Sequence, residues 1–116
     1  MPHFARENTA ALMGAATGLT YTPEQIQEVG ERINNLARAF NAREGFGRAE
    51  DTLPERVLTE PLQSGASKGH LVRKQDLKEM LDEYYGARDW DVDTGIPTRK
   101  KLAELGLDYA ADHLGL

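Results

Sequence analysis

Apolar residues recur at alternating steps of three and four in the first half of the chain, which is the spacing of one face of an α-helix. The positions are Ile26, Val29, Ile33, Leu36 and Phe40. A helix with this pattern normally turns its apolar face toward the core. We therefore expect Val29, Ile33, Leu36 and Phe40 to be its best-buried positions.

The residues before and after this face supply signals for the ends of the helix. Thr22 offers an N-cap hydroxyl, Pro23 suits the first helical position, and Gln25 lies three residues after the cap. Gly45 is a natural stop, because glycine readily adopts the left-handed conformation that ends many helices. The sequence predicts one long central helix over about residues 23–44.

The remaining pattern predicts shorter helices. One begins near Asn8 or Thr9, one follows an N-cap at Asp51, and one follows an N-cap at Thr98 with Leu102 and Leu105 inward. A further apolar stripe runs through Leu77, Met80, Leu81, Tyr84 and Tyr85. Alternation typical of β-strands is missing. The expected fold is all-α: a compact multihelical domain of four to five helices with long loops, formed by residues 1–116 as a single domain.

Composition and charge exclude several functional classes. Charged residues make up 28% and hydrophobic residues 40%, as in ordinary globular domains. The net charge is −5 with acids and bases interleaved, so the basic stripe of a nucleic-acid interface is missing. No apolar run is long enough for a membrane span. The chain contains no cysteine, which excludes thiolate metal ligands and disulfides and makes a cytoplasmic setting the default expectation.

Two short motifs resemble ligand sites but lack residues that those sites require. Asp89, Asp91 and Asp93 alternate as in a calcium loop, but Thr94 and Lys100 stand where the EF-hand needs glycine and glutamate. A solvated acidic turn with Trp90 pointing inward is the better interpretation. The segment SGASKGH, residues 64–70, lacks the P-loop order of glycine and lysine and has no preceding strand, so it is expected to be a surface loop.

Dense charges surround Gly45 and Phe46, and two interpretations stay open. The charges belong to Arg43, Glu44, Arg48, Glu50, Asp51, Glu55 and Arg56. They either form ion pairs that fix a loop facing a ligand cavity, or they are an ordinary solvated loop. We predict no catalytic, cofactor-binding or metal-ligating residue. The candidate interface or cavity-facing positions are Arg43, Phe46, Asp51, Leu53 and Arg56.

Several blocks of this sequence, in the same order, resemble the C-terminal helical region of the tungsten-containing aldehyde ferredoxin oxidoreductases. The blocks are GERINNLARAFNAREGFGRAEDTLPER, SKGH, LDEYYGARDWD and GIPTRKKLAELGL, and together they cover about residues 12–107. Enzymes of that family oxidise aldehydes to carboxylic acids and pass the electrons to ferredoxin. The resemblance implies a tungstopterin and a 4Fe–4S cluster in a full-length parent enzyme.

The cysteines that ligate the cluster in that family, including one in an Asp-x-x-Gly-x-Cys motif, have no counterpart in this chain. The resemblance therefore implies fold and context, and no catalytic residue. The favoured hypothesis is a C-terminal domain that closes the cofactor cavity of a parent enzyme and is inactive alone. Its partners would be the remaining domains, with ferredoxin reached only through the full enzyme. The alternative is a stand-alone helical module that dimerises or docks through its alanine-rich first helix and the loop of Phe46, Leu53 and Leu58.

Overall fold

The computed structural model describes residues 2–116, with side-chain surroundings described from residue 6 onward, and within this range every regular element is helical. The elements are α1 (Pro2–Thr17), α2 (Pro23–Arg43), the short 3₁₀ helix η1 (Arg48–Glu50), α3 (Glu55–Thr59), α4 (Lys74–Ala87), α5 (Arg99–Glu104) and α6 (Asp108–Leu114). The described chain contains a single isolated β-bridge, between Trp90 and Pro97. The all-α class is confirmed, with six α-helices in the described range where four to five were expected.

The long helix α2 begins and ends where the sequence indicated. The Thr22 hydroxyl accepts from the Gln25 backbone N–H at 3.2 Å, and the Gln25 side chain accepts from the Thr22 N–H at 2.8 Å. This reciprocal capping box satisfies two N–H groups that the helix itself leaves unpaired. Beyond the other end Gly45 has a φ of 91°, a conformation that favours glycine. The predicted helix over residues 23–44 is therefore confirmed.

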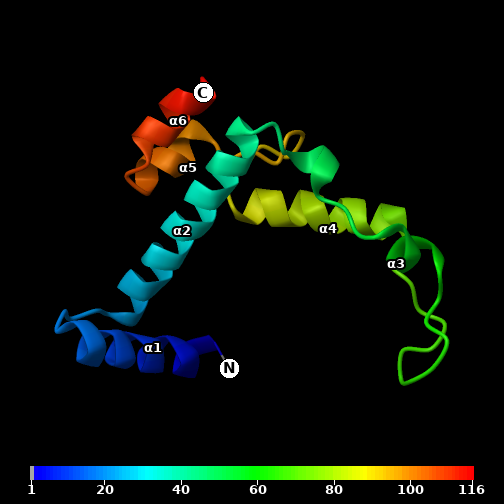
Figure 1. The fold of residues 1–116 in the computed structure, drawn as a ribbon, viewed down its shortest axis with the longest axis horizontal. Coiled ribbons are helices and arrows are strands. Elements are labelled where there is room, and N and C mark those ends of the chain that lie inside the picture. Colours follow the sequence, from blue (N-terminus) through cyan, green and yellow to red (C-terminus); the bar gives the residue numbers. More distant parts are fainter. Residues whose placement is uncertain (1) are drawn as a thin grey trace.

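The helices are arranged openly (Figure 1). Helices α1 and α2 meet at the turn around Gly18 and diverge as a V, α5 and α6 lie beside the later half of α2, and α4 runs crosswise to it. The Cα radius of gyration is 18.0 Å. A compact domain of this length would have a radius of about 13 Å. The helices are therefore spread more widely than in a globular domain of this length. In the described part of the chain, no helix combines the length and the apolar content that crossing a membrane requires.

The main hydrophobic core sits where α5 and α6 meet the later half of α2. Thr98 caps α5 through the backbone N–H of Lys101 at 3.1 Å, as predicted. Leu102 is fully buried and Leu105 is 8% exposed, so both predicted inward positions are confirmed. The cluster consists of Ala39, Leu102, Leu105, Leu107, Ala110 and Ala111.

The apolar face of α2 points away from this core, contrary to the sequence prediction. Ile33 is 64% exposed and Phe40 55%, and Val29 and Leu36 are also exposed. The buried positions of α2 are Asn35 and Ala39, at 0% and 4%. With about 100° between successive residues, Asn35 lies about 200° around the helix from Ile33. The prediction failed because the rest of this chain packs on the opposite side of the helix.

The other helices mix confirmed and corrected expectations. Helix α1 contacts α2 as expected, but it starts at Pro2, so Asn8 and Thr9 lie inside it. On α4, Tyr85 is 1% exposed while its neighbour Tyr84 is 43% exposed, as expected for adjacent helical positions.

Candidate functional site

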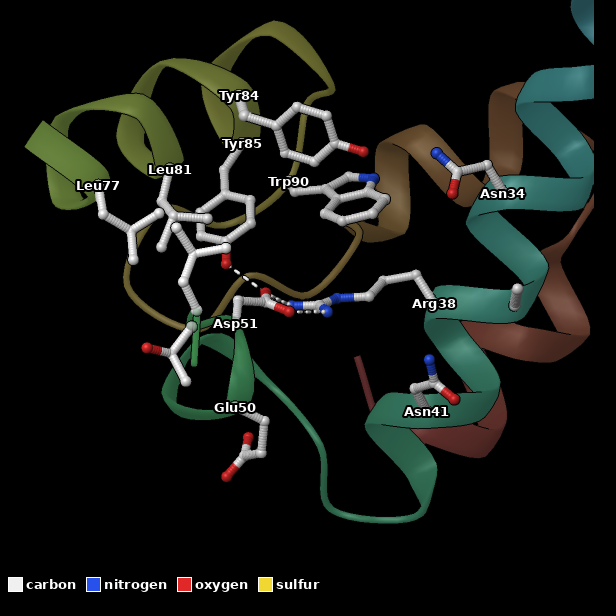
Figure 2. A pocket seen from close by; sticks show the side chains of 13 residues that line it. Asn34, Arg38, Asn41, Glu50, Asp51, Leu77, Leu81, Tyr84, Tyr85 and Trp90 are labelled. Carbon is white, nitrogen blue, oxygen red and sulfur yellow. Dashed lines mark hydrogen bonds and ion pairs between the residues drawn. The ribbon is translucent and has the colours of Figure 1, made fainter. Parts of the chain in front are cut away.

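A groove of about 450 Å³ opens between α2, α4 and the loop that follows α2 (Figure 2). One wall is mainly polar and comes from α2 and the loop; the other is mainly apolar and comes from α4 and Trp90. The lining residues are Asn34, Ala37, Arg38, Asn41, Glu50, Asp51, Thr52, Leu53, Leu77, Leu81, Tyr84, Tyr85 and Trp90. Its volume lies in the range of small-molecule pockets.

Arg38 of α2 forms the central contact of the groove. Its Nη1 donates to Asp51 Oδ1 at 2.9 Å and its Nη2 bonds the second carboxylate oxygen, so the pair is bidentate. Its Nε donates to the carbonyl oxygen of Gly95 at 2.8 Å. The Arg38 side chain is only 11% exposed. One guanidinium therefore joins α2 to two separate loops with three directed bonds.

Tyr85 of α4 completes the cluster by donating its hydroxyl to Asp51 (Figure 2). Burial raises the pKa of Tyr85 to about 12, and the hydrogen bond to Asp51 and that carboxylate's charge act in the same direction. Burial alone would raise the pKa of Asp51, but the hydrogen bonds from Arg38 and Tyr85 outweigh it and lower that pKa. The carboxylate is thus held ionised and the phenol is held protonated.

Trp90 is buried and lines the groove. Its indole N–H donates to Asn35 Oδ1 at 2.8 Å. Its ring stacks on the Tyr85 ring, with 6.1 Å between the two ring centroids, and the Arg38 guanidinium lies 5.2 Å from the Trp90 ring centroid. Gly95 must approach closely here, because a Cβ at this position would lie 2.6 Å from Arg38 Nη2. We call Arg38, Asp51, Tyr85 and Trp90 the bracket, since together they fix α2, α4 and the intervening loop relative to one another.

Arg48 adds a second link from the same loop to α4. Its guanidinium pairs with Asp82 at 2.6 Å, donates to the Val92 carbonyl oxygen at 2.7 Å and lies 5.3 Å from the Tyr85 ring centroid. The dense charges after α2 therefore contain ion pairs that fix the loop. The sequence placed Arg48 and Asp51 in the charged segment. It gave no signal for Arg38 or Tyr85, whose positions relative to Asp51 depend on the tertiary fold.

The structure does not bring the five candidate positions into one site. Asp51 and Leu53 line the groove, whereas Arg43 borders a separate small hollow near α6. Phe46 is 55% exposed, and the Arg56 side chain is 82% exposed and pairs with Glu60 at 3.0 Å.

Two sequence expectations about the loop after α2 are wrong. Asp51 does not cap α3: Pro54 precedes that helix, with no side-chain cap bond, because the Asp51 carboxylate is engaged by Arg38 and Tyr85. Leu58, a candidate for the docking surface, is only 7% exposed because it is packed within the chain.

The side chains that the structure describes do not form a metal or cluster site. Within residues 6–116, no group of three or more histidine, aspartate or glutamate side chains is placed to hold a metal ion. In the acidic turn, Asp91 instead accepts from the backbone and hydroxyl of Thr94 at 2.8 and 2.7 Å, and Asp89 pairs with Lys100 at 3.5 Å. A 4Fe–4S cluster takes thiolate ligands, and the chain has none.

Comparison with known proteins shows which family the sequence of this chain matches. The family described as aldehyde ferredoxin oxidoreductase, domains 2 & 3, matches residues 1–107. The tungsten-containing aldehyde ferredoxin oxidoreductase of Pyrococcus furiosus is 48% identical over 97 residues, which are 83% of this chain and 15% of that protein. The aliphatic sulfonate oxidoreductase, WOR-like subunit, of the same organism is 36% identical over 102 residues, covering 83% of this chain and 16% of that protein.

A solved structure shares the fold. A chain of the active site complex BamBC of benzoyl coenzyme A reductase, in complex with 1,5-dienoyl-CoA, superposes with a TM-score of 0.72 at 31% identity. The match covers 92% of this chain and 14% of that chain. This chain thus spans about 15% of the length of the curated relatives it matches.

Proposed function

Because the chain belongs to the aldehyde ferredoxin oxidoreductase family, we propose that it serves as a C-terminal helical part of a tungstopterin enzyme. That enzyme would oxidise an aldehyde to a carboxylic acid and transfer the electrons to ferredoxin. The observation that carries the proposal is the match of residues 1–107 to domains 2 & 3 of the family. A cytoplasmic setting accords with the absence of cysteine.

In this proposal the chain forms part of the wall of the enzyme's cavity and takes no part in the redox chemistry. Tungstopterin and the 4Fe–4S cluster belong to the remaining domains, because this chain has no thiolate to ligate a cluster. The bracket holds the groove wall rigid, so that Asp51 and Leu53 face a cavity shared with those domains. Arg43, Phe46 and Arg56, which lie outside the groove, are proposed contacts with the same domains. Ferredoxin would be reached only through the complete enzyme.

A chimeric enzyme tests the proposal. The 97-residue matching segment of the P. furiosus enzyme is replaced by this chain, and tungsten content and aldehyde-dependent ferredoxin reduction are measured. We expect a tungsten-loaded, active chimera, since 48% identity over the segment preserves the fold. The control is the same enzyme rebuilt with its own segment.

The chain alone is measured in parallel and is expected to hold no stoichiometric tungsten or iron and to oxidise no aldehyde. The proposal fails if the chimera folds without tungsten or activity while the rebuilt control is active. It also fails if the isolated chain carries the metals and reduces ferredoxin by itself.

A stand-alone module that associates with itself is the second candidate. Exposed apolar side chains outside the groove favour it: Leu12 is 70% exposed, Leu19 57% and Phe46 55%. Soluble monomers rarely leave large contiguous apolar patches open, and a two-fold dimer is the simplest cover. Sedimentation of the chain at several concentrations distinguishes a dimer from a monomer.

A further inference from the structure

Helix α2 carries a continuous apolar face that the rest of the described chain leaves partly exposed. Val29, Ile33, Leu36 and Phe40 are between 40% and 64% exposed, and Tyr109 of the adjacent helix α6 is 52% exposed. We call these five side chains the ladder face. Leu36, Phe40 and Tyr109 border a small hollow of about 80 Å³ between α2 and α6, so the face continues from one helix onto the other.

The rotational setting of α2 is fixed by bonds on its opposite side. Asn35 accepts from the Trp90 indole at 2.8 Å, and Arg38 donates to Gly95 at 2.8 Å and pairs with Asp51. Asn35 is fully buried and Arg38 nearly so. Turning the ladder face inward would break each of these bonds and leave buried polar groups unpaired, which is costly. The hydrogen bonds of Asn35 and Arg38 therefore fix the ladder face in its outward orientation.

The composition of the ladder face resembles the centre of a protein interface. Isoleucine, leucine, phenylalanine and tyrosine occupy its middle, and cations stand at its border, as in interfaces with an apolar core and a polar rim. Arg43 at the border lies 4.9 Å from the Phe40 ring centroid and pairs with Glu44. Arg32 is exposed and has no ion-pair partner within the described residues. A covering surface should thus be apolar in the middle and carry an acidic side chain opposite Arg32.

We propose that the ladder face docks against such an apolar, acid-bordered surface in the remaining domains of the same oxidoreductase. This inference rests on the proposed function and names the surface through which the chain joins its enzyme. The relatives favour this occupant over a second copy, because the matched segment is about 15% of their length and includes all of α2. In such an enzyme most of the chain lies outside the segment and is available to cover the face.

The test compares ladder variants in the chimeric P. furiosus enzyme and in the 116-residue chain. Ile33→Asp places a carboxylate at the centre of the face. Met80→Asp is the matched control, because Met80 is an apolar helical residue, 59% exposed, outside both the ladder and the groove. Arg32→Glu and Arg32→Lys test the acidic border. Soluble tungsten-loaded chimera is quantified, and the urea midpoint and sedimentation of each chain variant are recorded.

We expect Ile33→Asp to lower the yield of assembled chimera by about tenfold or more, because an unpaired carboxylate is costly to bury, while Met80→Asp changes it little. Arg32→Glu should lower the yield and Arg32→Lys should retain it. In the isolated chain the urea midpoint of Ile33→Asp should lie close to that of the unsubstituted chain, because Ile33 is mostly exposed there.

Three outcomes overturn the inference. An Ile33→Asp chimera assembling as well as its parent shows that the ladder is not the joining surface. An Ile33→Asp chain that unfolds shows that the ladder belongs to its own core. A chain dimer that Ile33→Asp dissociates assigns the face to a second copy. Failure of the unsubstituted chimera is a separate result, which counts against the proposed function.

Discussion

At the scale of single residues, Asp51 is the point where α2, α4 and the loop between them are joined. Its carboxylate takes two bonds from Arg38 and one from Tyr85, partners 13 and 34 residues away in sequence. Local signals such as the Thr22 and Thr98 caps could be predicted because their partners lie three residues away. The bracket could not, because no spacing rule links residues that only the tertiary fold brings together.

Removing the Asp51 charge should destabilise the chain. Asp51→Asn keeps the size of the side chain but leaves the nearly buried Arg38 guanidinium without its counter-ion. We expect a loss of about 1–3 kcal/mol in the free energy of unfolding, measured by urea denaturation at neutral pH. Glu60→Gln, which breaks an exposed pair with Arg56, is the control and should cost less than about 0.5 kcal/mol. Equal effects of the two substitutions would contradict the role given to the bracket.

The same carboxylate sets a dependence on acid pH. The pKa of Asp51 is lowered in the folded state from its ordinary value of 3.8. The unfolded state therefore takes up the proton first as the pH falls, so this contribution to stability is present above 3.8 and is lost as the pH drops through the folded pKa. Urea midpoints measured from pH 7 to pH 2 should fall as the pH drops. Part of this loss of stability should be missing in the Asp51→Asn variant. A variant with the unchanged acid profile would argue against this linkage.

Tyr85 sets a dependence on alkaline pH. Its pKa is raised in the folded state from 10.0 to about 12, so the unfolded state loses the phenolic proton first. Its contribution to stability is fully present below pH 10 and declines as the pH rises toward about 12. Absorbance titration of phenolate should contain a component near pH 12 that Tyr85→Phe removes. If the Tyr85→Phe variant keeps the titration component near pH 12, that component belongs to another tyrosine.

At the scale of elements, α2 shows what a periodic pattern can and cannot predict. The spacing of Ile26, Val29, Ile33, Leu36 and Phe40 correctly placed the helix and its apolar face. It could not say which neighbour covers that face, because periodicity describes one helix and not its surroundings. Inside this chain the covered positions are Asn35 and Ala39 instead. The buried asparagine is satisfied by Trp90, a contact that a search for apolar positions overlooks.

The two kinds of apolar position should respond differently to truncation. Leu102 is fully buried in the α5–α6 core, so Leu102→Ala should cost about 2–5 kcal/mol of unfolding free energy. Ile33 is 64% exposed, and Ile33→Ala should cost less than about 1 kcal/mol in the isolated chain. Urea denaturation of both variants provides the comparison. A large loss of unfolding free energy for Ile33→Ala would show that the apolar face of α2 belongs to the core of this chain.

At the scale of the whole molecule, the sequence predicted the fold class and the family. The all-α class follows from helical periodicity, and the family from several ordered blocks, which the match to residues 1–107 confirms. The open arrangement of the helices, with a radius of gyration of 18.0 Å, could not be predicted, because periodicity describes single helices and not how they pack against one another. An apolar helix face left open in this way accords with a chain that acts within a larger enzyme.

The most direct measurement is the structure of the chimeric P. furiosus enzyme that carries this chain. We expect residues from outside the exchanged segment to bury Val29, Ile33, Leu36 and Phe40, which are 40–64% exposed in the chain alone. The Arg38–Asp51 pair should be retained beneath them. A chimera in which these four side chains still face solvent would contradict both the docking surface and the role of this chain as a part completed by the rest of its enzyme.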